Sequence, residues 1–289
     1  MAAKAHPANR FWFWFRHNST LWSAANRVLL WRLNWKKRMV IQRLEAPNCV
    51  LHVRGLEIPL DLNDTSDFLF YHGGEDKWGY ESGLVETATM LVSHNDVCLD
   101  VGANRGYLSL VFSQLSGPGG RIHAFEPSPV AIAKFFRTVE ANRFSEASRA
   151  PIFLHQNAAW DCQETLSLYP SVIESGRDSV QSQGMRAPFQ IEAVKVDDIL
   201  RNERRVRLIK IDVEGSELQA LRGMRNVIDN SSDVVLLVEW NRSYATMELW
   251  DEIVDRFRVR RLSRHGPIAV HSPSSLHGTH TLLCERIPG

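Results

Sequence analysis

Long apolar runs and paired cysteines are both missing from this chain of 289 residues. No stretch of about 18 consecutive apolar residues occurs, so we expect no segment that spans a bilayer, and no signal peptide is visible. The four cysteines lie far apart and form no CxxC pair, which favours buried free thiols in a reducing compartment over disulfides or a zinc site. We therefore expect a cytoplasmic protein.

An excess of charge is missing as well, because 34 Lys and Arg residues stand against 33 Asp and Glu residues, a net charge of +1. This balance excludes a generally basic protein that binds nucleic acid. The distribution is nevertheless uneven, since residues 1–44 contain nine basic residues, no acidic residue and five of the nine tryptophans. The rest of the chain carries 25 basic and 33 acidic side chains, a net charge of −8.

The N-terminal arm, residues 1–44, combines these basic side chains with aromatic ones. Residues 11–15 read FWFWF, and residues 19–44 have the spacing of a helix whose broad apolar face is interrupted by Arg32 and Lys36. Tryptophan together with Lys and Arg is typical of helices that lie on a bilayer surface. We expect peripheral contact of residues 10–43 with an anionic membrane, at its inner face. Packing of the helix on the rest of the protein is the alternative.

Composition and patterning divide the chain into three regions. They are the arm (1–44), a hairpin and approach segment (45–95) and a main domain (96–289). In the second region, residues 50–62 predict two short strands and residues 83–93 a helix. A stretch rich in Ser, Gln and Gly at 171–188 predicts a flexible insertion in the main domain.

The main domain alternates apolar strands with amphipathic helices. Strands without polar alternation, separated by such helices, indicate a mostly parallel sheet that is covered on both faces. The fold class is therefore α/β. The expected strands are residues 97–101, 122–125, 152–154, 208–211 and 234–238.

The first strand ends in the turn Asp100-Val101-Gly102-Ala103-Asn104-Arg105-Gly106. Ligands of such sheets bind beyond the carboxyl ends of the strands, and Gly102 and Gly106 allow a tight turn. The spacing is GxxxG rather than the GxGxxG of dinucleotide sites, and no GK[ST] of a phosphate loop follows. An acidic residue before the turn suits a ligand with a cationic amine better than a pyrophosphate. A glycine turn that merely connects strand and helix is the alternative.

Polar residues also follow the next two strands. Glu126 ends the second strand, where a carboxylate can accept hydrogen bonds from both hydroxyls of a ribose. After the third strand, Asn157 can bind the edge of an adenine and Ala158 leaves room for its ring. A surface acid and a turn asparagine are the plainer interpretations of Glu126 and Asn157.

Carboxylates gather at the fourth and fifth strands. Asp212 and Glu214 follow the fourth strand and Glu239 ends the fifth, and clustered carboxylates near a buried strand end are costly unless they are paired or used. Glu217 has a structural explanation, because an acid in the first turn of a helix favours the helix dipole. Asp212 is the first candidate for a functional acid, Glu214 the second and Glu239 the third.

The phrases DVGANRGY, AFEP, NAAW, LIKIDVEGSE and LLVEW, in that order over residues 96–240, resemble the FkbM family of S-adenosylmethionine-dependent methyltransferases. The resemblance implies a Rossmann-like class I sheet of seven strands with one antiparallel strand, for which residues 279–285 are the candidate. It further implies that Asp100 and Gly102, with Asn104 and Gly106 in the same turn, lie at the methionine part of S-adenosylmethionine. Glu126 would then lie at the ribose, and Asn157 and Ala158 at the adenine.

These observations predict an O-methyltransferase that acts on a hydroxyl of a small molecule or glycan, such as a sugar or a polyketide-type metabolite. Asp212 would accept the hydroxyl proton or hold the acceptor, with Glu214 and Glu239 as further candidates. A divalent cation between Asp212 and Glu239 is less favoured, and no metal site is assigned.

Two alternatives stay open, a nicotinamide-dependent oxidoreductase and a non-enzymatic protein at the membrane periphery. Acceptor specificity is expected in residues 63–82, 171–188 and 241–248.

Overall fold

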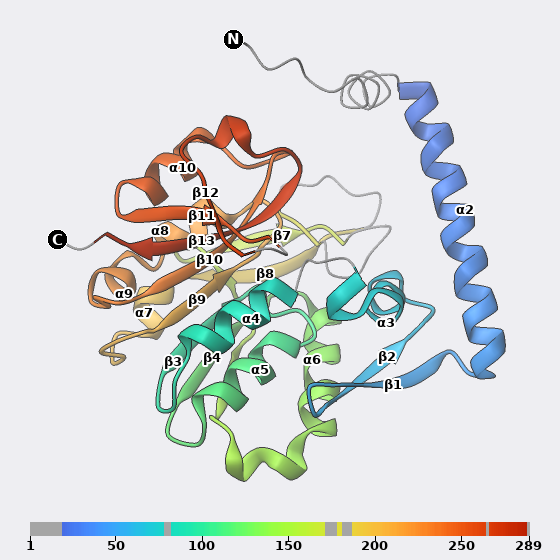
Figure 1. Ribbon diagram of the computed structural model, residues 1–289, viewed down its shortest axis with the longest axis horizontal. Helices are drawn as coiled ribbons and strands as arrows, with labels where there is room; N and C mark the ends of the chain where they lie inside the picture. Colours follow the sequence, from blue (N-terminus) through green and yellow to red (C-terminus); the bar gives the residue numbers. More distant parts are fainter. Residues whose placement is uncertain (1–18, 78–81, 171–177, 181–186, 264–265, 288–289) are drawn as a thin grey trace.

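The computed structural model describes residues 19–77, 82–170, 178–180, 187–263 and 266–287 (Figure 1). Among these residues the main sheet has eight strands, one more than the resemblance implied, in the order β12-β11-β13-β10-β9-β3-β4-β5. Their bounds are β3 Val97–Val101, β4 Arg121–Phe125, β5 Ile152–His155, β9 Leu208–Ile211, β10 Val235–Asn241, β11 Phe257–Arg261, β12 Ile268–Ala269 and β13 Thr279–Arg286. All five strands expected in the main domain are present.

Strand direction confirms the expected α/β class. Strands β5, β4, β3, β9 and β10 run parallel to one another, whereas β13 is antiparallel to both of its neighbours, β10 and β11. The antiparallel strand expected at residues 279–285 is thus β13. Because the parallel strands all point the same way, their carboxyl ends meet at one edge of the sheet.

Helices cover both faces of this sheet (Figure 1). One face carries α4 (Ser82–Leu91), α5 (Tyr107–Ser116) and α6 (Pro129–Ala141), and the other carries α7 (Val196–Ile199), α8 (Glu217–Arg222), α9 (Arg225–Asp229) and α10 (Met247–Val254). Neighbouring strand residues point to opposite faces, so Cys98 packs with Phe112 of α5 while Leu99 packs with Leu221 of α8. Burial on both faces explains the uninterrupted apolar strands.

The approach segment holds a hairpin and a helix that the sequence did not predict. Strands β1 (Asn48–Val53) and β2 (Leu56–Asp61) pair around Arg54 and Gly55, which both have positive φ, as a tight hairpin turn requires. The sequence predicted no helix between the two strands and residue 83, but α3 (Thr65–Lys77) lies there. Its Phe68 is fully buried, so tertiary packing stabilises a helix whose sequence has little amphipathic pattern.

A small second sheet lies beside the main one. Its order is β6-β8-β7, with β6 Ala158–Ala159, β7 Glu164–Leu168 and β8 Phe189–Val194. The insertion 171–188 connects β7 to β8, and most of it lies outside the described residues. Its residues 178–180 are described, and Ser179 pairs with Tyr169. Short 3-10 helices at Arg143–Ser148 and Pro273–Ser275 complete the described elements.

The arm forms the helix α2 (Ser19–Leu44), with the bounds expected from the sequence. Residues 10–16 lie outside the described residues. No helix in the described parts of the chain is long and apolar enough to cross a membrane. All four cysteines are free thiols, but only Cys98 and Cys284 are buried as expected, whereas Cys162 is exposed.

Candidate active site

The carboxyl ends of β3, β4 and β9 surround a cavity of about 1110 Å³, a volume that includes its open mouth. Residues of α3, α4, α5, α6 and the small sheet also contribute to the lining. The residues singled out from the sequence that line this cavity are Gly102, Asn104, Glu126, Ala158, Asp212 and Glu214. Those that do not line it are Asp100, Gly106, Asn157 and Glu239.

The glycine turn after β3 is held by protein contacts. The N–H groups of Gly102 and Ala103 both donate to the Phe125 carbonyl at the end of β4, at 2.9 and 3.0 Å. Gly102 has φ +81°, and a Cβ there would lie 1.8 Å from the Asp212 carbonyl oxygen. A Cβ on Gly106 would lie 2.7 Å from the Phe135 ring. Both glycines are therefore required by packing, and Gly102 brings the turn directly against the backbone of Asp212.

A buried lysine lies between Asp100 and the cavity. Lys210 Nζ donates to the Gly102 carbonyl at 2.6 Å and lies 3.4 Å from Asp100 Oδ1 and 3.9 Å from Asp212 Oδ2. Asp100 is fully buried and also accepts a hydrogen bond from Ser109 Oγ at 2.6 Å. Burial lowers the pKa of Lys210, but the charges of Asp100 and then Asp212 outweigh it and raise the pKa overall. Lys210 therefore stays charged. Asp100 does not line the cavity, so it can influence a bound ligand only through Lys210.

Sequence reasoning did not single out Lys210 as a site residue. The available signal was a lysine inside the otherwise apolar strand sequence LIKI, all of which is buried. A buried charge requires a partner, so such a lysine indicates carboxylates close by.

Glu126 links the glycine turn to the next helix. Its Oε2 accepts the N–H of Asn104 and its Oε1 accepts the N–H of Ser128, both at 2.8 Å. Burial raises the pKa of Glu126 to about 7, although the two backbone donors favour the ionised form. Each carboxylate oxygen can accept a further hydrogen bond, so the group can still bind donors from the cavity.

Of the two residues expected at the adenine, only one lines the cavity. Ala158, in β6, is buried and lines the cavity, whereas the half-buried Asn157 precedes that strand and is not part of the lining. Three other lining residues have a buried side-chain oxygen without a hydrogen-bond partner among the described residues. They are Asn104, Tyr107 and Ser216. Unpaired buried polar groups are costly, so these residues favour a polar ligand.

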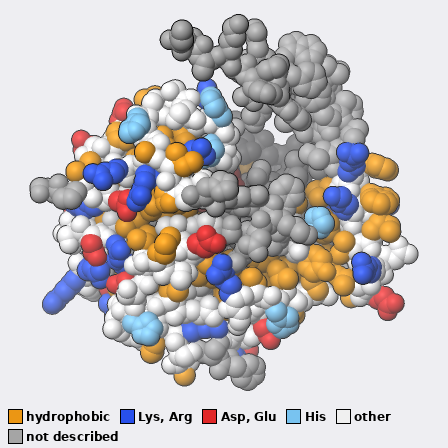
Figure 2. Space-filling model, viewed as in Figure 1, with side chains coloured by type: hydrophobic (Ala, Val, Ile, Leu, Met, Phe, Trp, Pro, Cys, Tyr) orange, Lys and Arg blue, Asp and Glu red, His pale blue; other side chains and the backbone are white. Residues whose placement is uncertain are grey.

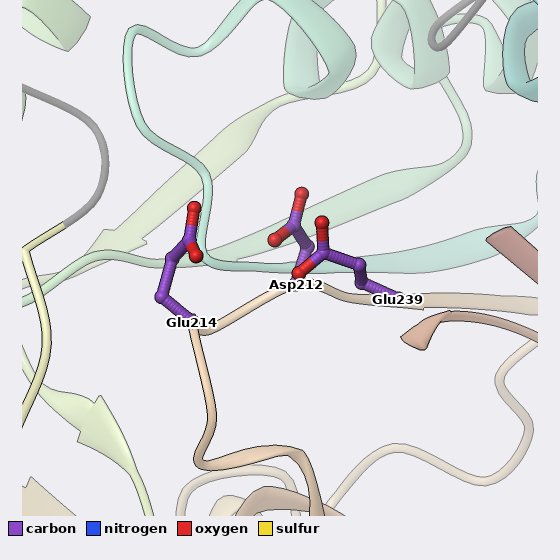
Figure 3. A group of neighbouring side chains, drawn as sticks. All are labelled: Asp212, Glu214 and Glu239. Atoms are coloured by element: carbon purple, nitrogen blue, oxygen red, sulfur yellow. The ribbon is translucent and has the colours of Figure 1, made fainter. Parts of the chain in front are cut away.

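The three candidate acids converge at the ends of β9 and β10 (Figure 3). Carboxylate oxygens of Asp212, Glu214 and Glu239 all lie within 4.8 Å of one another. Glu214 adopts φ +51°, an uncommon conformation for a residue with a side chain. Such an arrangement could hold a divalent cation, but acidic groups often cluster without one, so the cluster alone does not indicate a metal.

Tyr244 joins two members of this acidic cluster. Its hydroxyl lies 2.6 Å from Glu239 Oε2 and 3.0 Å from Glu214 Oε2. Burial, followed by the charge of Glu239, raises the pKa of Tyr244 above its ordinary value, so the phenol keeps its proton. Tyr244 lies in residues 241–248, one of the segments where acceptor specificity is expected.

Glu217 is structural, as its position at the start of α8 predicted. Its Oε1 accepts the N–H groups of Val213 and Gly215, both at 3.1 Å, and the side chain is buried. Burial raises the pKa of Glu217 to about 7. The carboxyl therefore fixes the turn that carries Asp212 and Glu214.

Helix α3 lines one side of the cavity, and a buried charge network holds it there. Asp67 is 1% exposed, and its Oδ1 lies 2.9 Å from Arg105 Nη1 and 2.6 Å from Lys134 Nζ. Arg105 also stacks over the ring of Phe70, at 4.9 Å from its centre, and both residues line the cavity. This wall was not foreseen, because it depends on a helix that the sequence pattern does not show.

Known methyltransferases are similar to this chain. A family model described as the methyltransferase FkbM domain matches residues 100–263. Methyltransferase 1 of Beauveria bassiana is 28% identical over 172 residues, which cover 51% of this chain and 67% of that protein. The 31-O-demethyl-FK506 methyltransferase FkbM of Streptomyces tacrolimicus is 29% identical over 158 residues, with 45% and 60% covered. Hexuronic acid methyltransferase AglP of Haloferax volcanii is 26% identical over 159 residues, with 54% and 61% covered.

The alignments thus span about three fifths to two thirds of each relative. The family match, residues 100–263, covers more than half of this chain. It contains the glycine turn, Glu126 and all three candidate acids. The motifs that resemble the family at the sequence level are therefore part of one matched domain, and the chain belongs to the FkbM methyltransferase family.

Proposed function

We propose that the protein is an S-adenosylmethionine-dependent O-methyltransferase that acts on a hydroxyl of a sugar, a glycan or a polyketide-type metabolite. One observation carries the proposal. Asp212 and Glu214, at the end of β9, line the same cavity as the glycine turn and Glu126. A group that can bind the cofactor and a group that can take a proton from the acceptor thus face one space.

The lining fits the chemistry of the cofactor. Glu126 would accept hydrogen bonds from the ribose, and Ala158 leaves space for the adenine. The unpartnered oxygens of Asn104 and Tyr107 would face the polar methionine part, while Asp100 supports that end of the cavity through Lys210. When bound, S-adenosylmethionine supplies an electrophilic methyl group on a sulfonium.

The acids of the site would act on the acceptor. Asp212 is in contact with the cavity and would accept the proton of the hydroxyl as it reacts. Lys210 Nζ lies 3.9 Å from Asp212 Oδ2, so a positive charge borders the proposed base. Glu214 would orient the acceptor hydroxyl, and Glu239 would support Glu214 through Tyr244. The rate enhancement would come from alignment and from proton removal.

The names of two relatives are compatible with an oxygen atom as the methyl acceptor. One is named for a 31-O-demethyl substrate and the other for hexuronic acid. Both names describe molecules with oxygen groups that a methyl can join, and they are compatible with the sugar and polyketide-type classes alike.

Binding and turnover test the proposal together. Calorimetric titration is expected to detect binding of S-adenosylhomocysteine and not of NADH; the reverse result would favour an oxidoreductase. Transfer of labelled methyl from S-adenosylmethionine is then measured on panels of sugars, uronic acids and polyketide lactones.

Asp212→Asn should retain affinity for S-adenosylhomocysteine and lose turnover by about 100-fold or more. Asp198→Asn, at an exposed position of α7, is the matched control. Normal turnover by Asp212→Asn would show that the base lies elsewhere.

A further inference from the structure

One face of the C-terminal half of α2 is fixed to the protein body. Val40 and Ile41 pack against the apolar cluster that contains the β2 hairpin strand. Lys37 is buried on the same side, and its Nζ donates to the Asn63 carbonyl at 2.7 Å and to Thr65 Oγ1 at 3.2 Å. These contacts determine which side of the helix remains outward.

The outward side carries large apolar side chains. Trp31, Trp35 and Met39 are 66%, 54% and 49% exposed. They are spaced four residues apart, so they follow one stripe along the helix. Soluble proteins seldom leave such side chains side by side in water without a binding partner. Packing on the body and an exposed apolar stripe therefore coexist on opposite faces of α2.

Basic residues border this stripe on both sides. With 3.6 residues per turn, Arg32, Lys36 and Arg43 fall along one edge and Arg38 along the other. All four are exposed, and no acidic residue occurs in residues 1–44. Figure 2 shows hydrophobic and basic side chains together at the right-hand edge of the molecule, where Figure 1 places this half of α2.

We propose that this face of α2, defined by Trp31, Trp35, Met39 and the four bordering basic residues, lies on an anionic bilayer surface. Tryptophan favours the membrane–water interface, and Lys and Arg are attracted to anionic headgroups. A second copy docked through the same face would oppose two clusters of positive charge, which repel each other. A lipid surface provides both the apolar layer and the negative charge. The inference is independent of the methyltransferase activity.

Vesicle flotation with the full-length protein tests this inference. Binding is expected to vesicles of phosphatidylcholine with about 30% phosphatidylglycerol, and to be at least about tenfold weaker with phosphatidylcholine alone. Arg32→Gln with Lys36→Gln should weaken partitioning by about 25-fold, since each basic side chain near the surface contributes about fivefold. Trp31→Ala with Trp35→Ala should weaken it by about tenfold or more.

The matched control is Phe136→Ala with Arg137→Gln, an exposed aromatic and basic pair on α6 that should leave partitioning within about twofold. Thermal unfolding followed by circular dichroism verifies that each variant is folded. Unchanged partitioning of the folded Trp31/Trp35 variant would overturn the proposal. Self-association that those two substitutions abolish, with no vesicle binding by the unmodified protein, would also overturn it and assign the face to a second copy.

Discussion

The pKa of Glu126 predicts how cofactor affinity depends on pH. Burial raises this pKa to about 7, so near neutrality the ligand-free protein contains both the acid and the carboxylate. Ribose hydroxyls donate hydrogen bonds, and a carboxylate accepts them better than a protonated carboxyl does. If Glu126 binds the ribose, the ligand selects the ionised form. Affinity should then rise with pH, and binding below the pKa should release a proton.

The size of the effect follows from the ionised fraction. With a pKa of about 7, roughly one molecule in ten is ionised at about pH 6 and roughly nine in ten at about pH 8. Affinity for S-adenosylhomocysteine should therefore increase about tenfold over this range, or by about 1.4 kcal/mol. Stability of the ligand-free protein changes in the opposite sense. A carboxyl whose folded pKa is raised contributes stability below its unfolded value of 4.5 that is lost as pH rises through about 7.

Calorimetric titration in buffers with different ionisation enthalpies measures both affinity and proton release. Glu126→Gln should bind more weakly, by about tenfold or more at about pH 8, and should lose most of the pH dependence. Glu217→Gln is the matched control, because its carboxyl has a similarly raised pKa but bonds the turn before α8. Constant affinity of the unmodified protein from about pH 6 to 8, with no proton released, would refute a titrating Glu126 at the ribose.

Two further substitutions test how the cavity is built. Gly102→Ala places a Cβ 1.8 Å from the Asp212 carbonyl oxygen at φ +81°, so we expect a loss of at least about 2 kcal/mol in the free energy of unfolding, measured by urea denaturation. Asp67→Asn removes the buried charge shared by Arg105 and Lys134, and the same measurement should show a loss of about 3 kcal/mol because both cations remain buried.

Each of these substitutions has a control in the same chain. Gly55 has φ +73° with no atom within 4 Å of an added Cβ, so Gly55→Ala reports backbone strain alone, about 1 kcal/mol. Asp233 pairs with Arg205 at a position where the carboxylate is 45% exposed, and Asp233→Asn should cost less than about 1 kcal/mol. If Gly102→Ala and Gly55→Ala reduce the free energy of unfolding equally, the close contact at Gly102 has no effect. If Asp67→Asn and Asp233→Asn do so, burial of the charge has none.

The central sheet could be predicted because its strands are buried on both faces. Burial on both sides requires uninterrupted apolar residues, so β3 and β9 appear in the sequence with their observed bounds. The ends of β9 and β4 then locate Asp212 and Glu126, since parallel strands bring their carboxyl ends to one edge. At these positions the local sequence pattern is therefore sufficient to predict the tertiary structure.

Elements held by a few specific contacts could not be predicted in this way. Helix α3 has little apolar periodicity. Its attachment depends on Phe68 and on the charge pairs of Asp67 with Arg105, in the turn before α5, and with Lys134 of α6. Tyr244 reaches the acidic cluster from a loop beyond β10, and nothing in its sequence neighbours indicates that its hydroxyl will meet Glu214, 30 residues away. Such pairings arise from the folded arrangement and leave no periodic signal.

The glycine turn shows how a motif can be located correctly and explained incompletely. The sequence left open whether the turn at Gly102 serves a ligand or only connects strand and helix, and the nearest atom to a Cβ there belongs to Asp212. The missing side chain therefore lets the turn after β3 touch the turn after β9. Lys210 strengthens the same junction by bonding the Gly102 carbonyl while lying near both Asp100 and Asp212. Under the proposed function, the turn that binds the cofactor also positions the proposed base, so Gly102→Ala should impair turnover beyond any loss of cofactor affinity.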